Sequence, residues 1–137
     1  MAFIALCLSV ISCDSKKMIP PSELPHEITG YLSTYFPNDN ILQSMVEKDG
    51  FKKSYEIVLS SNTNLEFNRQ KEIVDIDGNT KLPDAVIPEK IRDYVAKNLT
   101  GRFITDWGYD DRGQQVKLDN GMELKFSKQG DFIRIDD

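Results

Sequence analysis

Apolar residues along this chain follow two alternating periods. A stripe at i, i+3, i+4, i+7 and i+8 in residues 25–36 predicts an amphipathic helix with one buried side. A matching stripe predicts a second helix over residues 88–98. Pro25 and Pro88 open these helices, where the missing N–H of proline is tolerated. The stripes consist of Ile28, Tyr31, Leu32, Tyr35 and Phe36 in the first helix and of Ile91, Tyr94, Val95 and Leu99 in the second.

After each predicted helix the period changes to two. Tyr55, Ile57 and Leu59 alternate with Glu56 and its neighbours, which is typical of a strand with one buried face. The same alternation recurs at Leu65 and Phe67, Val74 and Ile76, Val116 and Leu118, Leu124 and Phe126, and Ile133 and Ile135. Asn120-Gly121 is a hairpin signal between two of these strands. Each helix is therefore expected to lead into about four short antiparallel strands.

The two helix-plus-strand segments are copies of one unit. Ile28, Tyr31, Leu32 and Ile41 match Ile91, Tyr94, Val95 and Ile104 at an offset of 63, and later positions match at an offset of 59. The first copy has four extra residues around Glu47 to Lys53. We expect an α+β fold in which both helices pack on one face of a shared antiparallel sheet. The repeats span residues 24–81 and 82–137, and the stiff joint Leu82 to Pro88 makes residues 24–137 a single domain.

Composition removes several classes of function. The 137 residues carry 17 basic and 22 acidic side chains, a net charge of -5, without a basic run, which argues against a nucleic-acid partner. Cys7 and Cys13 lie in the first 13 residues, so the body offers no cysteine nucleophile, thiolate metal site or disulfide. With His26 as the single histidine, no catalytic residue, cofactor site or metal site is assigned.

The amino terminus is expected to be a targeting segment. Residues 2–12 are uncharged and almost all apolar, and they are too few to span a bilayer, which fits the signal peptide predicted for residues 1–12. Val10-Ile11-Ser12-Cys13 resembles a bacterial lipobox, which implies cleavage before Cys13 and lipid attachment to its sulfur. Residues 13–23 would form a tether to the membrane. An ordinary secretory signal or a first strand are the alternatives, and the choice between inner and outer membrane stays open.

Two groups of acidic residues could suggest a site. Residues 75–80 approach the start of a calcium loop, but the glycine comes early and no glutamate follows at the twelfth position. Asp106, Asp110 and Asp111 could act as paired carboxylates in acid–base chemistry. We interpret both segments as polar turns.

Aromatic residues near the start of the second sheet half suggest a binding surface. Because Ile104 matches Ile41, it is expected to face the helices, and alternation then places Phe103, Trp107 and Tyr109 on the open face. The same parity places Phe132 and Arg134 there. Tryptophan, tyrosine and arginine on an uncovered sheet favour protein binding. The alternatives are a second core layer, or a bulge at Gly108 that turns Trp107 inward.

These motifs together resemble a known family. A lipobox precedes two copies of a Pro-x-x-Ile-x-x-Tyr helix pattern, and the second copy continues through Asn120-Gly121, Phe126 and Gly130. This arrangement is similar to the PepSY-like proteins of Bacteroides and relatives, whose fold is similar to the β-lactamase-inhibitor protein. The resemblance covers residues 24–136, although Asn62-Thr63 replaces Asn-Gly and Lys71 replaces a glycine in the first copy.

The resemblance implies an exported protein of the periplasm or cell surface with a non-catalytic binding role. We expect a lipid-anchored binding or inhibitor-like module, whose partner is an envelope or secreted protein such as a peptidase or another enzyme. The alternative is an envelope sensor that binds a small ligand or a peptide. An enzymatic role is disfavoured because the chain lacks the usual nucleophiles, phosphate loops and clustered metal ligands.

Overall fold

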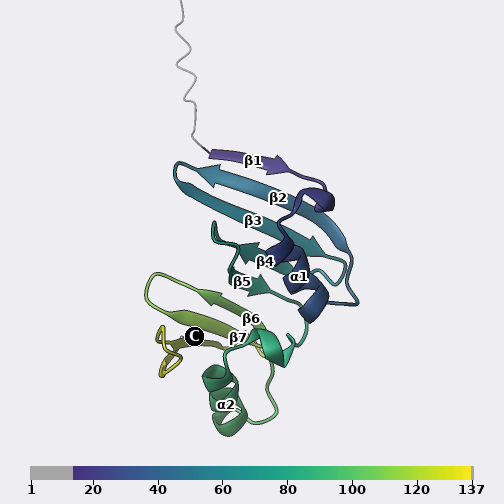
Figure 1. Ribbon diagram of the computed structural model, residues 1–137. Helices are drawn as coiled ribbons and strands as arrows, with labels where there is room; N and C mark the ends of the chain where they lie inside the picture. The colour runs from purple at the N-terminus through teal and green to yellow at the C-terminus, as the bar shows by residue number, and fades with distance from the viewer. Residues whose placement is uncertain (1–13, 137) are drawn as a thin grey trace, which may run out of the picture.

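The chain forms one antiparallel sheet of nine strands with two helices, as the computed structural model of residues 14–136 describes (Figure 1). The strands follow one another across the sheet in chain order. The strands are β1 (Asp14–Met18), β2 (Ile41–Asp49), β3 (Lys52–Leu59), β4 (Asn64–Phe67), β5 (Ile73–Asp77), β6 (Ile104–Tyr109), β7 (Gln114–Leu118), β8 (Glu123–Phe126) and β9 (Phe132–Asp136). The helices are α1 (His26–Tyr35) and α2 (Glu89–Asn98), each preceded by a short 3-10 turn, η1 (Pro21–Glu23) or η2 (Asp84–Val86). The predicted signal peptide and Cys13 lie outside the described residues.

The predicted α+β duplication is confirmed. α1 leads into β2–β5, and α2 leads into β6–β9. Each helix begins directly after the proline that was expected to open it, Pro25 or Pro88. Neither helix is long and apolar enough to cross a bilayer.

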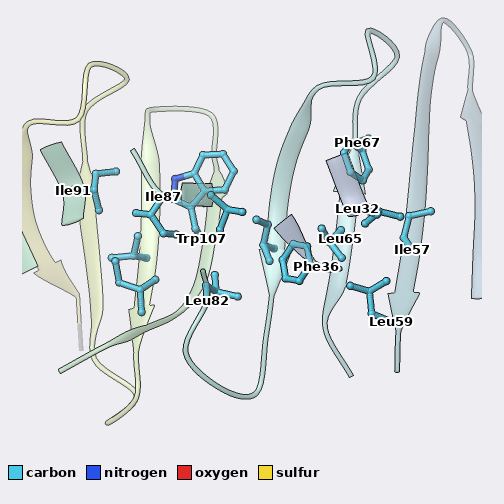
Figure 2. Packing of buried hydrophobic residues seen from close by; sticks show 14 of the residues in the cluster. Leu32, Phe36, Ile57, Leu59, Leu65, Phe67, Leu82, Ile87, Ile91 and Trp107 are labelled. Atoms are coloured by element: carbon cyan, nitrogen blue, oxygen red, sulfur yellow. The ribbon is translucent and has the colours of Figure 1, made fainter. Parts of the chain in front are cut away.

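A buried row of side chains runs straight through both repeats. In register, Ile57 on β3 pairs with Leu65, Leu65 with Ile76, and Ile76 with Trp107 on β6. The row continues through Val116 to Leu124, and all six side chains are buried. Because side chains alternate between the faces of a strand, one face of the sheet is buried from β3 to β8. Ile28 and Leu32 of α1 and Ile91 and Val95 of α2 belong to the same core, so both helices cover this face (Figure 2).

The expected tether over residues 13–23 is wrong for its described part. Residues 14–18 form β1, which pairs with β2 from Asp14 opposite Asp49 to Met18 opposite Met45. The Ser44 hydroxyl then donates a hydrogen bond to the Ile19 carbonyl at 2.7 Å, which fixes the chain as it leaves the sheet. Residues 14–18 are therefore part of the sheet.

Each repeat carries two β-bulges at equivalent places. An extra residue, Leu42 in β2 and Thr105 in β6, interrupts the pairing with the next strand. A second extra residue, Val74 in β5 and Ile133 in β9, interrupts the pairing with the preceding strand. A bulge reverses which face the following residues occupy, so it changes every assignment made by simple alternation.

Candidate functional site

The face of the sheet opposite α1 and α2, called the open face below, carries a second in-register row. Among its members, Glu56 pairs with Glu66, Glu66 with Asp75, and Asp75 with Gly108. Gly108 pairs with Gln115, Gln115 with Lys125, and Lys125 with Arg134. The row is acidic over β3–β5 and basic over β8–β9.

The acidic part of the open face holds carboxylates at raised pKa. Partial burial, followed by repulsion from Glu66 and Asp77, raises the pKa of Asp75 to about 6. Partial burial and contact with the Asp77 carboxyl, directly opposite in the ladder, raise the pKa of Asp106 to about 6. The pKa of Glu66 is also raised, by burial and then by Glu56 and Glu47. Lys16 pairs with Glu56 at 2.7 Å at the margin of this group.

Gly108 explains why the Asp75 carboxylate is desolvated although the residue as a whole is exposed. A Cβ atom at position 108 would lie 2.4 Å from the Asp75 Oδ1 atom, so the carboxylate lies directly over the glycine backbone. One side of the carboxylate therefore loses water while the rest remains accessible. Desolvation of this kind disfavours the charged form.

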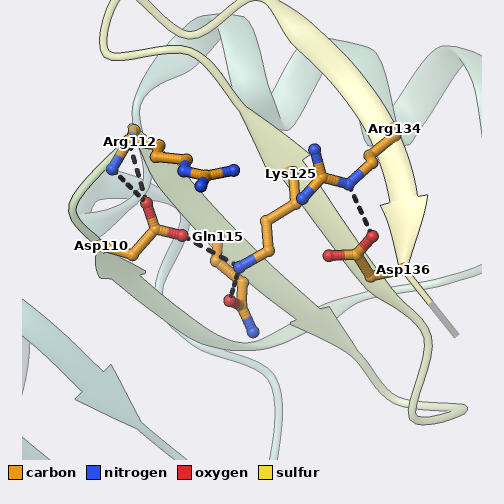
Figure 3. Close-up of polar contacts among 7 residues, drawn as sticks. Asp110, Arg112, Gln115, Lys125, Arg134 and Asp136 are labelled. Atoms are coloured by element: carbon orange, nitrogen blue, oxygen red, sulfur yellow. Dashed lines mark hydrogen bonds and ion pairs between the residues drawn. The ribbon is translucent and has the colours of Figure 1, made fainter.

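The basic part of the open face is held by local hydrogen bonds (Figure 3). The Lys125 ammonium donates to Asp110 Oδ2 at 2.9 Å and to the Gln115 side chain. The backbone N–H groups of Arg112 and Gly113 also donate to Asp110, and together with Lys125 they lower the Asp110 pKa to about 2. Arg134 Nε donates to Asp136 Oδ1 at 2.7 Å. These contacts fix the positions of two cations, each of which is paired with a carboxylate.

The chemistry available on this face is electrostatic recognition. Within residues 14–136, no group of three or more His, Cys, Asp or Glu side chains is placed to hold a metal ion. Asp110, Arg112 and Gly113 form the hydrogen-bonded turn expected for residues 110–113. A charged sheet with preset polar groups is suited to binding, since complementary potentials give specificity.

Four of the five predicted partner-binding residues do not lie on the open face. Trp107 is 4% exposed in the core, and its Nε1 donates to Gln114 Oε1 at 2.9 Å. Tyr109 has the same strand parity as Trp107, packs against it at 5.1 Å between ring centroids, and is 51% exposed. Phe132 stacks on Tyr94 of α2 at 4.3 Å.

Of the two remaining predicted residues, Phe103 lies on the helix side and Arg134 lies on the open face. Phe103 precedes β6, is 37% exposed, and lines a groove of about 420 Å³ beside α2. Arg134 pairs with Lys125 and lies on the open face, as predicted. The partner-binding role of these residues stays a prediction.

Three of the four errors, those for Trp107, Tyr109 and Phe132, have one cause, the extra residue of a bulge. The extra residue Thr105 separates Ile104 from the rest of β6, so Ile104 and Trp107 share the buried face although they lie three positions apart. A bulge thus turns Trp107 inward, at Thr105 and not at the suggested Gly108. The extra residue Ile133 does the same for Phe132, which pairs with the buried Phe126.

The helix side of the sheet also carries a hollow. A groove of about 670 Å³ is lined by Trp107 and Tyr109 on one side and by Ile87, Pro88 and the β4–β5 turn on the other. It lies where the second helix meets the junction of the repeats, and its lining mixes aromatic, aliphatic and polar groups.

Comparison with known proteins identifies the family. A family model described as "Putative beta-lactamase-inhibitor-like, PepSY-like" matches residues 10–75 and again residues 53–134. The chain belongs to this PepSY-like family. No curated protein matches the chain significantly.

Solved structures of Bacteroides proteins resemble this PepSY-like chain over nearly its full length. A Bacteroides vulgatus protein described as a putative periplasmic protein is 31% identical, with a TM-score of 0.84, over 90% of this chain and 98% of its own. A Bacteroides thetaiotaomicron protein described as a "putative calcium-regulated periplasmic protein" is 28% identical, with a TM-score of 0.83, over 89% and 97%. A second B. vulgatus protein, described as a "putative periplasmic protein of unknown function", is 28% identical with a TM-score of 0.81, over 90% of this chain and 99% of its own.

Sequence reasoning missed the charged row of the open face. The signal was present in the duplication: at the offset of 59, Glu66 matches Lys125 and Asp75 matches Arg134. Equivalent outward positions of the two copies thus carry opposite charge. Comparison of the polar positions of the repeats, as well as the apolar ones, would have found it.

Proposed function

We propose that this PepSY-like protein is a non-enzymatic binding module of the bacterial envelope, anchored through lipid on Cys13, that contacts a protein partner through its open face. The supporting observation is that both helices cover the same side of the sheet. The other side is crossed by an ordered row of charged side chains, with acidic Glu66 and Asp75 in one half and basic Lys125 and Arg134 in the other. A partner with the opposite arrangement of charge would fit this row.

The family description adds support for a protein partner. The matched model is described as inhibitor-like, which supports a binding role. The relatives are described as periplasmic proteins, which agrees with the export expected from the amino terminus. A secreted peptidase or another envelope enzyme is the partner class we propose.

A second candidate is an envelope sensor for a small ligand or a peptide. The groove beside Trp107 and Tyr109 favours it, because its volume of about 670 Å³ lies in the range of ligand pockets and its walls carry aromatic groups. An extended ligand there would contact the exposed side of Tyr109.

Site-specific photocrosslinking distinguishes the two proposals. A benzophenone amino acid is placed at Gln115 on the open face, at Tyr109 in the groove, or at Lys97, an exposed residue of α2, as the control. We expect an adduct with an envelope protein from Gln115 and none from Lys97. An adduct from Tyr109 alone supports the sensor and contradicts the open-face proposal.

Affinity measurements with the captured partner give the quantitative test. Glu66→Lys and Arg134→Glu are each expected to weaken binding by about ten-fold or more, because like charges would then face each other across the contact. Lys97→Glu makes a comparable change of charge on the helix side and should leave affinity unchanged. Equal affinities for all three variants would refute the open-face contact.

A further inference from the structure

The β2–β3 hairpin differs from its counterpart in the second repeat. β2 extends from Ile41 to Asp49 and β3 starts at Lys52, whereas β6 and β7 span residues 104–109 and 114–118. The four extra residues of the first repeat therefore lengthen one hairpin. Phe51 at its tip is 94% exposed, more than any other large apolar side chain described. The core gains nothing from this phenylalanine.

The hairpin tip lies at the end of the sheet where β1 begins (Figure 1). Asp14 is paired with Asp49, and Asp49 with Lys52 across the hairpin. Consecutive Cα atoms are about 3.8 Å apart, and Cys13 is bonded to Asp14. A lipid on Cys13 would therefore be attached close to the hairpin tip that carries Phe51. A lipid on Cys13 would hold this end of the sheet against the membrane surface with no flexible tether between them.

The same end of the sheet is positively charged in an acidic protein. Residues 14–18 and 46–54 contain five lysines and three acidic residues, while the whole chain has a net charge of -5. Lys17, Lys48 and Lys53 line one shallow groove of about 270 Å³ together with a single carboxylate, Glu23. No ion pair is found for these three lysines among residues 14–136.

Two of these lysines face each other. Lys48 and Lys53 are direct partners in the β2–β3 ladder, where like charges are destabilising. An anion bound between them would remove that repulsion. Anionic phospholipid headgroups supply such charge at the bilayer surface, where they attract basic residues.

We propose that the tip of the β2–β3 hairpin is a membrane-docking element: Phe51 enters the interfacial layer of the bilayer, and Lys17, Lys48 and Lys53 bind anionic phospholipid headgroups. The proposal rests on acylation of Cys13 and is independent of what binds the open face. In this orientation the strands extend from the membrane surface into solution. The open face is then roughly perpendicular to the membrane and remains accessible to a partner.

The test uses the acylated mature protein reconstituted into vesicles of phosphatidylethanolamine and phosphatidylglycerol. Acylation blocks the Cys13 thiol, so Phe51→Cys provides one free thiol for an environment-sensitive NBD fluorophore. Phe103→Cys is the matched control, because Phe103 precedes β6 at the opposite end of the strands. Lipids carrying a nitroxide near the headgroup quench a fluorophore that lies in the interface.

We expect the label at position 51 to shift to the blue and to be quenched by the nitroxide lipid, and the label at position 103 to remain aqueous. Lys17→Gln, Lys48→Gln and Lys53→Gln should each lower the ratio of docked to undocked protein about five-fold, without lowering the melting temperature. Vesicles of phosphatidylcholine alone should also reduce docking.

Three results would overturn the proposal: a label at position 51 as aqueous as that at position 103, docking unaffected by the lysine substitutions, or a Cys13 without acyl groups by mass spectrometry. Protection of position 51 without vesicles would indicate self-association of the tip and would also overturn it. Crosslinking from Gln115 does not depend on docking of the hairpin tip, so failure of docking is separable from failure of the open-face contact, whereas a Cys13 without acyl groups would overturn the lipid anchor in both proposals.

Discussion

At the scale of single residues, the carboxylates of the open face lower the stability of the isolated protein. Asp75 lies over Gly108 and next to Glu66 and Asp77, and its pKa of about 6 records the repulsion and desolvation. Its equivalent in the second repeat is Arg134, which is paired with Asp136. One copy of this position is therefore paired locally, whereas Asp75 has no ion-pair partner within residues 14–136.

The Asp75 carboxyl should make the protein less stable as pH rises. Its pKa of about 6 in the folded state exceeds the unfolded value of about 3.9, so the folded state binds more protons between these values. The free energy of unfolding therefore falls from about pH 4 to above pH 6. Asp75→Asn should raise stability at pH 7 by about 1 kcal/mol, a figure reduced for solvent screening, and flatten the pH dependence.

Urea unfolding at pH 4.5, 6 and 7.5 measures this effect. Asp93→Asn on the exposed surface of α2 is the matched control and should change neither the stability nor its slope with pH. Measurements stay above pH 4 because Asp110, with its pKa lowered to about 2, contributes stability that is lost in more acidic solution. An Asp75→Asn variant less stable than the parent protein at pH 7.5 would contradict the account.

At the scale of elements, periodicity predicted the helices and strands well because burial on one side imposes it. It assigned Trp107 and Phe132 to the wrong face of the sheet. A bulge changes the sequence by only one inserted residue, yet that residue reverses the face that its neighbours in the strand occupy. The spacing of three between Ile104 and Trp107 was the available hint. The charged row could be predicted only by comparing the polar positions of the two copies. Alternation of apolar and polar residues shows which positions face solvent, but it does not show the sign of their charge.

The turns show how the copies diverged. Gly121 and Gly130 have φ values of 85° and 91°, and their counterparts Asn62 and Lys71 keep positive φ, at 62° and 65°. A lysine in this left-handed region suffers a clash of its Cβ that costs about 1–2 kcal/mol. The β4–β5 turn thus has a lysine in the left-handed conformation that a glycine adopts at the equivalent turn of the second repeat.

Lys71→Gly should stabilise the protein by about 0.5–1 kcal/mol, because relief of strain exceeds the added entropy of the unfolded chain. Lys71→Ala is the control: it removes the side chain but keeps the Cβ clash, so little gain is expected. Thermal and urea unfolding of both variants give the comparison. Equal gains for glycine and alanine would assign the effect to the lysine charge instead of the backbone.

At the scale of the whole molecule, the two repeats are joined through one short ladder. β5 and β6 share three pairs, Asp75–Gly108, Ile76–Trp107 and Asp77–Asp106. Backbone hydrogen bonds from Gly78 to Thr105 and from Leu82 to Ile104, both 2.9 Å, extend this junction. Because the core passes through Ile76 and Trp107 without a break, we infer that neither repeat has a hydrophobic core of its own.

Unfolding should therefore be a single cooperative transition that involves both repeats. Trp107 is the only tryptophan and reports on the second repeat, while Ile57 lies in the first and is completely buried. Ile57→Ala should destabilise the protein by about 2–4 kcal/mol and move the Trp107 fluorescence transition by as much as the circular dichroism transition. Leu124→Ala in the second repeat should move both transitions together in the same way. If Ile57→Ala shifted the circular dichroism transition and left the Trp107 transition in place, the repeats would be independent folding units, and the junction at β5 and β6 would be a contact between two domains.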